Sequence, residues 1–255
     1  MMDDNRFEAM LAHAGGPMQG WDFSYLSRTE RMTSEPLPWS YGSLVIAAMA
    51  QARSMLDMGT GGGEFLSALR PLPAETQATE GWAPNIPIAR ERLEPLGITV
   101  HGFASEDDPL PFADQTFDLV INRHEAYDPA EVLRVLRPGG RFITQQVGGE
   151  SERDLNLLLD APPEIDYSDW TLPRAREELT SAGFTLLDER EAFPINRCYD
   201  IGALVFYLNA TPWHVAGFNV DAFRPQLRAL HDRIMREGFI DLRSHRFLLV
   251  AEAPD

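Results

Sequence analysis

The stretch "LDMGTGGGEF", residues 56–65, places four glycines within five positions directly after an apolar run. Glycine loses more conformational freedom on folding than any other residue, so such a cluster indicates backbone that turns sharply or lies close against a ligand. An acid stands on either side of it, at Asp57 and Glu64. The stretch therefore predicts a ligand-binding turn at the end of a buried strand.

Outward from this loop, short apolar runs alternate with runs of helical periodicity. Each predicted strand up to position 140 is followed by a helix or by a turn-rich segment. This strict alternation predicts parallel βαβ units with helices on both faces of one sheet. We expect strands at 53–58, 75–80, 98–103, 116–123 and 141–147, and helices at 64–72, 83–97 and 128–140.

The alternation loosens after Gly148. A helix is expected at 172–183 and strands at 184–193 and 245–253, with roughly fifty residues between these two strands. An interval of that length is usually a lid or a second packing layer. We therefore expect four parts along the chain, namely a helical cover at 1–50, an α/β core at 51–193, a lid-like insertion at 194–240 and the final strand at 241–255.

Composition restricts the class of partner. The chain has 255 residues with 39 acidic and 22 basic side chains, a formal charge of -17, and all of its basic residues are arginines. Such a charge opposes binding to nucleic acid and to anionic membrane surfaces. The single cysteine, Cys198, excludes an internal disulfide and a cysteine-based zinc site. No apolar run is long enough to span a membrane, and we expect a soluble cytoplasmic protein.

The spacing of the glycine loop restricts its ligand. A dinucleotide fingerprint requires G-x-G-x-x-G, and here Gly59, Gly61 and Gly63 are followed by Glu64. A phosphate-binding loop ends in Gly-Lys-Ser/Thr, and this chain has no lysine. Both phosphate-binding interpretations, including a nicotinamide-dependent oxidoreductase, are therefore disfavoured. The two flanking acids suit a ligand that carries an ammonium group and no phosphate.

Four motifs over residues 52–147 together resemble the class I S-adenosylmethionine-dependent methyltransferases, in particular their metal-independent, ubiquinone-biosynthesis-like (type 11) domain. The first is "DMGTGGG", which is similar to the family's acid-x-Gly-x-Gly-x-Gly loop. The second is Glu80 of "TQATEGW", 23 positions after Asp57. The others are "EDDPLPFADQTFDLV" and "RVLRPGGRFI", and all four follow the family's order.

The resemblance implies a Rossmann-like, doubly wound α/β fold with a mostly parallel seven-stranded sheet whose last strand is antiparallel. It implies S-adenosylmethionine as cofactor, bound by residues of the core at 51–193. In the family the acid that closes the second strand takes the ribose hydroxyls, which here is Glu80, and Ser105, Glu106 or Asp107 would contact the adenine. The expected cofactor-binding residues are Asp57, Gly59, Thr60, Gly61, Gly63, Glu80, Gly81, Trp82, Ser105, Glu106 and Asn122.

Some of these residues have a second interpretation. Asp57 could brace the loop through backbone amides, and Trp82 could flank the adenine or pack against the sheet edge. An aromatic group near the N-terminus could wall an acceptor pocket or form core. That group consists of Trp21, Phe23, Tyr25, Trp39 and Tyr41.

The segment "INRHEAYD" after the fourth strand lies where this family faces the transferred methyl group. His124 is the candidate general base, because its ordinary pKa lies near neutral pH. The alternative is a histidine that only forms hydrogen bonds within the loop, in which case His214 of the insertion could be the base. Gln145 could reach the acceptor or merely finish its strand. No metal is expected, because only Asn122 is present where a cluster of ligands would be needed.

The sequence thus predicts direct displacement at a sulfonium methyl by an O, N or C nucleophile of a small organic acceptor. Two alternatives remain, an RNA methyltransferase and a non-catalytic protein that binds an adenosyl ligand. Neither the acceptor nor the oligomeric state follows from the sequence.

Overall fold

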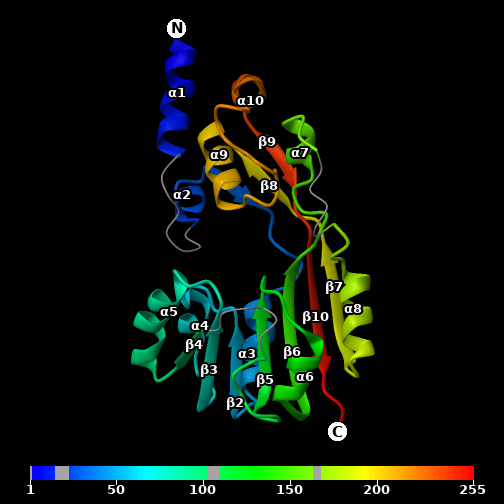
Figure 1. Ribbon diagram of the computed structural model, residues 1–255. Coiled ribbons are helices and arrows are strands. Elements are labelled where there is room, and N and C mark those ends of the chain that lie inside the picture. Colours follow the sequence, from blue (N-terminus) through cyan, green and yellow to red (C-terminus); the bar gives the residue numbers. More distant parts are fainter. Residues whose placement is uncertain (1, 15–22, 103–108, 163–167) are drawn as a thin grey trace. The chain divides into compact units, whose positions relative to one another are not determined.

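The computed structural model describes residues 2–14, 23–102, 109–162 and 168–255 (Figure 1). The chain divides into two compact units. We call them the large-sheet unit, residues 38–147, 170–191 and 246–255, and the small-sheet unit, residues 1–37, 148–169 and 192–245. Within the described ranges, no helix has both the length and the apolar character that crossing a membrane requires.

The large-sheet unit contains a seven-stranded sheet in the order β4-β3-β2-β5-β6-β10-β7. Its pairs β2–β3, β2–β5, β3–β4 and β5–β6 are parallel, and β10 runs antiparallel to β6. The strands are β2 (Ser54–Met58), β3 (Glu75–Glu80), β4 (Thr99–Gly102), β5 (Phe117–Arg123), β6 (Leu136–Val147), β7 (Thr185–Ala192) and β10 (Arg246–Glu252). The helices are α3 (Tyr41–Met49), α4 (Glu64–Ala68), α5 (Asn85–Leu93), the 3-10 turn η1 (Glu94–Leu96), α6 (Pro129–Val135) and α8 (Leu172–Ser181).

The core of this unit follows from strands that are apolar on both faces. β2 is buried at every position, as expected for a central strand of a parallel sheet. One face packs against α6 and α8 through residues that include Leu56, Val120, Phe142 and Leu179. α3 contacts β5 and β6. The predicted α/β fold with a mostly parallel seven-stranded sheet and an antiparallel last strand is confirmed.

The small-sheet unit packs helices around a three-stranded antiparallel sheet in the order β1-β8-β9. Its core contains Phe7, Leu11, Leu204 and Leu227 among other apolar residues. The elements are α1 (Met2–Ala14), α2 (Ser24–Ser27), β1 (Met32–Ser34), α7 (Asp154–Leu158), β8 (Ile195–Cys198), α9 (Ile201–Ala210), α10 (Arg224–Glu237) and β9 (Ile240–Arg243).

The boundaries of the two units differ from the boundaries of the four parts expected from the sequence. The expected cover at 1–50 is split after residue 37, since α3 packs on the large sheet. Residues 148–169 belong to the small-sheet unit together with the expected insertion. The physical reason is pairing over a long sequence distance, because Met32 of β1 lies opposite Cys198 of β8.

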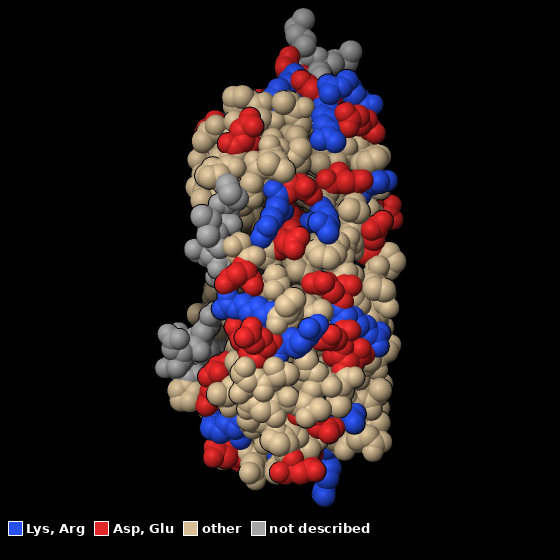
Figure 2. Space-filling model, turned by 90° about the vertical axis from the view of Figure 1, so that its right-hand side faces the viewer, with Lys and Arg blue, Asp and Glu red and all other residues tan. Residues whose placement is uncertain are grey.

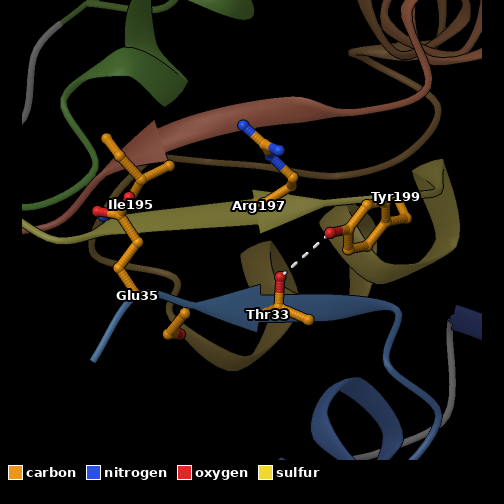
Figure 3. Close-up of a pocket in the computed structure, with 6 residues that line it drawn as sticks. Thr33, Glu35, Ile195, Arg197 and Tyr199 are labelled. Carbon is orange, nitrogen blue, oxygen red and sulfur yellow. Dashed lines mark hydrogen bonds between the residues drawn. The ribbon is translucent and has the colours of Figure 1, made fainter.

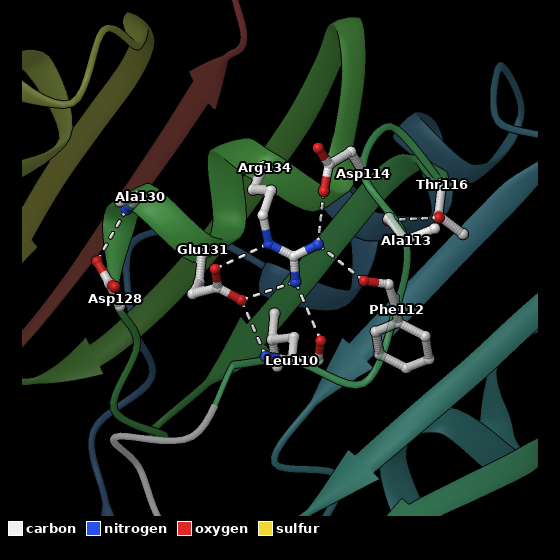
Figure 4. Close-up of polar contacts among 9 residues, drawn as sticks. All are labelled: Leu110, Phe112, Ala113, Asp114, Thr116, Asp128, Ala130, Glu131 and Arg134. Carbon is white, nitrogen blue, oxygen red and sulfur yellow. Dashed lines mark hydrogen bonds and ion pairs between the residues drawn. The ribbon is translucent and has the colours of Figure 1, made fainter.

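Arg134, a partly buried residue of α6, connects this helix to the loop that precedes β5 (Figure 4). The guanidinium of Arg134 donates to both carboxylate oxygens of Glu131 at 2.8 Å, to Asp114 at 2.9 Å and to two backbone carbonyls, at Phe112 and Leu110. These five hydrogen bonds use every N–H of the planar guanidinium. The contact joins α6 to the segment 110–114.

We expect Arg134→Lys to lower the free energy of unfolding by about 1 to 2 kcal/mol, because an ammonium group cannot reproduce the fork of donors. Arg174→Lys is the matched control, since its exposed pair with Glu178 on α8 spans one helical turn. That control should cost less than about 0.5 kcal/mol. Urea unfolding followed by circular dichroism compares the two variants, and equal losses would contradict the role given to Arg134.

Candidate functional site

The glycine loop leaves the carboxyl end of β2 and enters α4. Gly59, Gly61 and Gly63 all have positive φ, at 64°, 62° and 80°. A side chain at Gly59 would collide with Glu125, and one at Gly63 would meet Leu93 at 2.8 Å. At Gly61 a Cβ atom would have no neighbour within 4 Å among the residues that the structure describes. Two of the glycines are thus required by packing within the chain, whereas the third borders open space that a ligand can fill.

Asp57 braces this loop from inside. Its side chain is buried and accepts a hydrogen bond of 2.7 Å from the hydroxyl of Thr60. The amide of Thr60 donates to the carbonyl of Thr79 at 2.9 Å, which ties the loop to β3. Burial raises the pKa of Asp57 to about 7, while the Thr60 hydroxyl and the positive charge of Arg123 act in the opposite direction.

Glu80 ends β3 beside the loop. It is 3% exposed, and its Oε1 accepts from the amide of Trp82 at 2.8 Å. Burial raises the pKa of Glu80, and the nearby amides of Trp82, Gly61 and Gly81 limit the rise. The side chain of Asn85, which is fully buried at the start of α5, also lowers the pKa of Glu80. Among the described residues, its amide atoms have no partner that meets the distance and angle criteria of a hydrogen bond. The glycine loop therefore lies next to the carboxylate of Glu80. The side chain of Trp82 is 42% exposed.

Asn122 is fully buried near the carboxyl end of β5, opposite Met58 of β2 and Thr144 of β6. Its Oδ1 accepts from Gln146 at 2.7 Å and from Thr144 at 3.1 Å. Its backbone carbonyl accepts from the hydroxyl of Tyr41 at 3.0 Å. Within the described ranges its Nδ2 has no hydrogen-bond partner. The amide group thus offers an unused donor beneath the carboxyl edge of the sheet.

His124 follows β5 with a positive φ of 65° and is held by Gln145 of β6. Its backbone amide donates to the Gln145 carbonyl at 2.8 Å, and its Nε2 lies 3.1 Å from the Gln145 Nε2. The Gln145 Oε1 accepts from the indole N–H of Trp39 at 2.9 Å. The backbone and the ring of His124 are thus both hydrogen-bonded to Gln145 of the neighbouring strand.

Desolvation by surrounding protein lowers the pKa of His124 to about 3, and the positive charges of Arg246 and Arg123 lower it further. His124 is an exposed residue by surface area, and the positive charges of the two arginines are a second reason for its lowered pKa. A neutral ring at pH 7 is consistent with its hydrogen bond from Gln145.

The other predicted residues have different surroundings. Ser105 and Glu106, and the alternative Asp107, lie outside the described residues. His214 belongs to the small-sheet unit, with its Nε2 3.7 Å from the buried Oε2 of Glu152. Over the described part of the chain, no group of three or more histidine, cysteine or acidic side chains is arranged to hold a metal ion.

The small-sheet unit has a pocket of about 190 Å³ on β1 and β8 (Figure 3). Arg197, at its wall, is held by two hydrogen bonds of 2.7 and 2.8 Å to Asp241. The hydroxyl groups of Tyr199 and Thr33 are 3.4 Å apart. Since these polar groups already have partners within the unit, we assign this pocket no ligand.

Sequence reasoning missed Thr79 and Asn85, and it considered Glu125 only as a weaker catalytic candidate than His124. Thr79 holds the loop, Asn85 is buried beside Glu80, and Glu125 packs on Gly59. Thr79 directly precedes Glu80, the acid that ends β3, and this position could have indicated that Thr79 lies beside the glycine loop. The other two contacts depend on tertiary packing.

Residues 56–144 match a family described as "Methyltransferase domain". The ubiquinone biosynthesis O-methyltransferase of Ruegeria pomeroyi is 28% identical over 156 residues, which is 56% of this chain and 61% of that protein. The corresponding enzyme of Cereibacter sphaeroides is 30% identical over 122 residues, 45% of this chain and 44% of its own length. The chain thus spans about half the length of these curated relatives.

Solved structures share the fold at low identity. A candidate methyltransferase from Bacillus halodurans is 18% identical with a TM-score of 0.56, over 82% of this chain and 99% of that one. The [4+2]-cyclase SpnF is 18% identical with a TM-score of 0.52, over 99% and 94% of the two chains. The cyclase shows that likeness of fold does not fix the reaction.

We expect Gly61→Ala to abolish binding of S-adenosylhomocysteine while the protein stays folded. The matched control is Gly97→Ala, since Gly97 also has a positive φ, of 79°, and open space around it. Both variants should lose about 1 kcal/mol of stability from the strained backbone. Calorimetric titration and thermal unfolding test this expectation, and equal binding by the two variants would show that the space at Gly61 is not used by the ligand.

The pKa of Asp57 predicts a pH-dependent stability. Because its folded pKa of about 7 exceeds its ordinary value of 3.8, the folded state binds the proton more tightly. The wild type should therefore lose stability relative to Asp57→Asn as the pH rises from 4 to 7, by about 1.4 kcal/mol per pH unit at most, with no further loss above pH 7. Urea unfolding at each pH measures the difference, and a constant difference would contradict the buried, protonated carboxyl.

Proposed function

We propose that this chain, which belongs to the class I S-adenosylmethionine-dependent methyltransferase family, transfers a methyl group from that cofactor to a small organic acceptor. One observation carries the proposal: the open space at Gly61 borders the buried carboxylate of Glu80 at the carboxyl edge of parallel strands. In open α/β sheets, ligands bind outside this edge.

The chain's residues fit the cofactor in chemical type. Glu80 would accept hydrogen bonds from the ribose hydroxyls, because its carboxylate is held in place by the Trp82 amide. The exposed Trp82 ring would flank the adenine. Asp57 and Thr60 would keep the loop in the shape that leaves the space at Gly61 open. The adenine contact through Ser105 or Glu106 remains a proposal.

When bound, the cofactor supplies a methyl group on positively charged sulfur, which is already activated for transfer. The protein then has to orient the nucleophile, exclude water and, for a weakly acidic acceptor, remove a proton. His124 can remove that proton only after its Nε2 releases the Gln145 amide, since that nitrogen is the acceptor of the bond. His214 stays a second candidate for this step.

The charge distribution favours a small acceptor over RNA. On the face shown in Figure 2, arginines and acids are intermixed and form no continuous basic surface among the described residues. Arginines also form ion pairs with neighbouring acids, for example Arg176 with Glu189 and Arg190 with Asp188. An RNA methyltransferase would require a basic track for the phosphate backbone. Salt-sensitive RNA binding would support that alternative function.

We expect S-adenosylmethionine and S-adenosylhomocysteine to bind with micromolar dissociation constants, and NADH not to bind. Glu80→Gln should weaken both adenosyl ligands at least tenfold, because the neutral amide loses the charge-assisted hydrogen bonds to the ribose. Glu75→Gln is the matched control, an exposed acid at the other end of β3.

Calorimetric titration measures these affinities. No adenosyl binding by the wild type would overturn the proposal, and binding without methyl transfer to any of a panel of small acceptors would favour the non-catalytic alternative.

A further inference from the structure

We propose that the acceptor is an organic acid whose carboxylate binds at the carboxyl edge of β5 and β6, against the guanidinium of Arg123 and an N–H of the His124 ring. This inference rests on the proposed function and adds the chemical class of the substrate. It follows from the kind of hydrogen-bonding group that this edge presents.

The first step is the protonation of the His124 ring, which Trp39 determines through Gln145. The indole N–H can only donate, so the Gln145 atom 2.9 Å from it is the carbonyl oxygen. The amide nitrogen of Gln145 therefore faces the His124 Nε2 at 3.1 Å and donates to it. Since Nε2 is the acceptor, the proton of the neutral ring sits on Nδ1. The ring thus offers a donor to a ligand, and its basic nitrogen is already engaged.

The second step is the state of Arg123. Its guanidinium lies over the ring of Phe65 at 4.6 Å from the centroid, and it forms no ion pair with any residue of the described ranges. Arg137 shows the usual arrangement in this acidic chain, a contact of 2.9 Å with Asp118. A guanidinium without a carboxylate partner at the edge of the proposed site is suited to an anionic ligand.

The third step is the position of the remaining charges. Arg123 lies opposite Gln145, and Arg246 of β10 lies opposite Val147, so both arginines stand at the same edge of the sheet. Their positive charges also keep the pKa of His124 low. The acids of the site lie toward the glycine loop, since Glu125 packs on Gly59 and Asp57 is hydrogen-bonded to Thr60. The edge beside His124 therefore carries two arginines, and the charge of Arg123 also acts on the buried Asp57.

These steps together determine the acceptor class. A carboxylic acid is ionised at neutral pH, so its capture requires hydrogen-bond donors and no proton acceptor. Arg123 and the His124 Nδ1–H supply donors of that kind. A neutral alcohol would need a base to take its proton, and the His124 Nε2 that could serve is engaged by the Gln145 amide.

The ring protonation is tested by nitrogen NMR of protein labelled at its histidines, with His124→Gln identifying the His124 signals. The wild type should show a neutral ring protonated at Nδ1. Gln145→Glu should move the proton to Nε2, because a carboxylate there can only accept. A wild-type ring protonated at Nε2, or a charged ring at pH 7, would overturn the proposal.

The acceptor class is tested with benzoate and benzamide, titrated into protein saturated with S-adenosylhomocysteine and followed through the His124 signals. Benzoate should bind at least tenfold more tightly than benzamide, and Arg123→Met should weaken benzoate about tenfold. Arg141→Met is the matched control, because it removes the same charge from β6 away from the proposed site, where Arg141 pairs with Glu252 at the end of β10.

Equal binding of the two probes, no effect of benzoate on His124, or equal effects of the two arginine variants would each overturn the inference. If Arg123→Met instead weakens S-adenosylhomocysteine and leaves benzoate unchanged, Arg123 binds the carboxylate of the cofactor and the inference fails. Each of these outcomes is distinct from failure of the proposed function, in which the wild type does not bind S-adenosylhomocysteine at all.

Discussion

The site depends on one buried hydrogen bond, from the Thr60 hydroxyl to the carboxyl group of Asp57. A buried carboxylate inside a sheet is costly, and burial is the main cause of the raised pKa of Asp57, which the charge of Arg123 opposes. The bond offsets part of that cost and fixes the first turn of the loop, while the Thr60 amide fixes the same turn to Thr79. The loop can then keep a positive φ at every second residue, at Gly59, Gly61 and Gly63. Among the described residues, Gly61 faces open space.

Most of the large sheet could be predicted from the sequence because its signals are local. β2 and β5 each contain a short apolar run, and the glycine loop and the Asp128-Pro129 pair mark where helices begin. The Asp128 side chain does accept from the amide of Ala130, as an N-cap should. The helix that it starts ends at Val135 and not at the Pro138-Gly139-Gly140 breaker, because β6 already begins at Leu136. Local signals thus located the element, while sheet pairing set its end.

The small-sheet unit could not be predicted, because its strands are short and pair across long stretches of chain. β1 has three residues and β8 has four, so neither shows a usable alternation. Their pairing brings Ser34 to Asn196, and the Ser34 hydroxyl donates to the Asn196 side chain at 2.6 Å. Segments that appeared to be a cover and an insertion are therefore parts of one packed unit.

The role of His124 shows why residue type alone does not identify a catalytic base. Its place after β5 was predicted correctly, since sheet order fixes which loops meet at the carboxyl edge. Whether its nitrogen is free depends on Gln145, which is 21 residues away, and on Trp39, which precedes the whole sheet. The indole N–H of Trp39 orients the Gln145 amide, and that amide engages the His124 Nε2, so the proton of the neutral ring is placed on Nδ1. The availability of a base at this edge is therefore set by hydrogen bonds between residues that are far apart in the sequence.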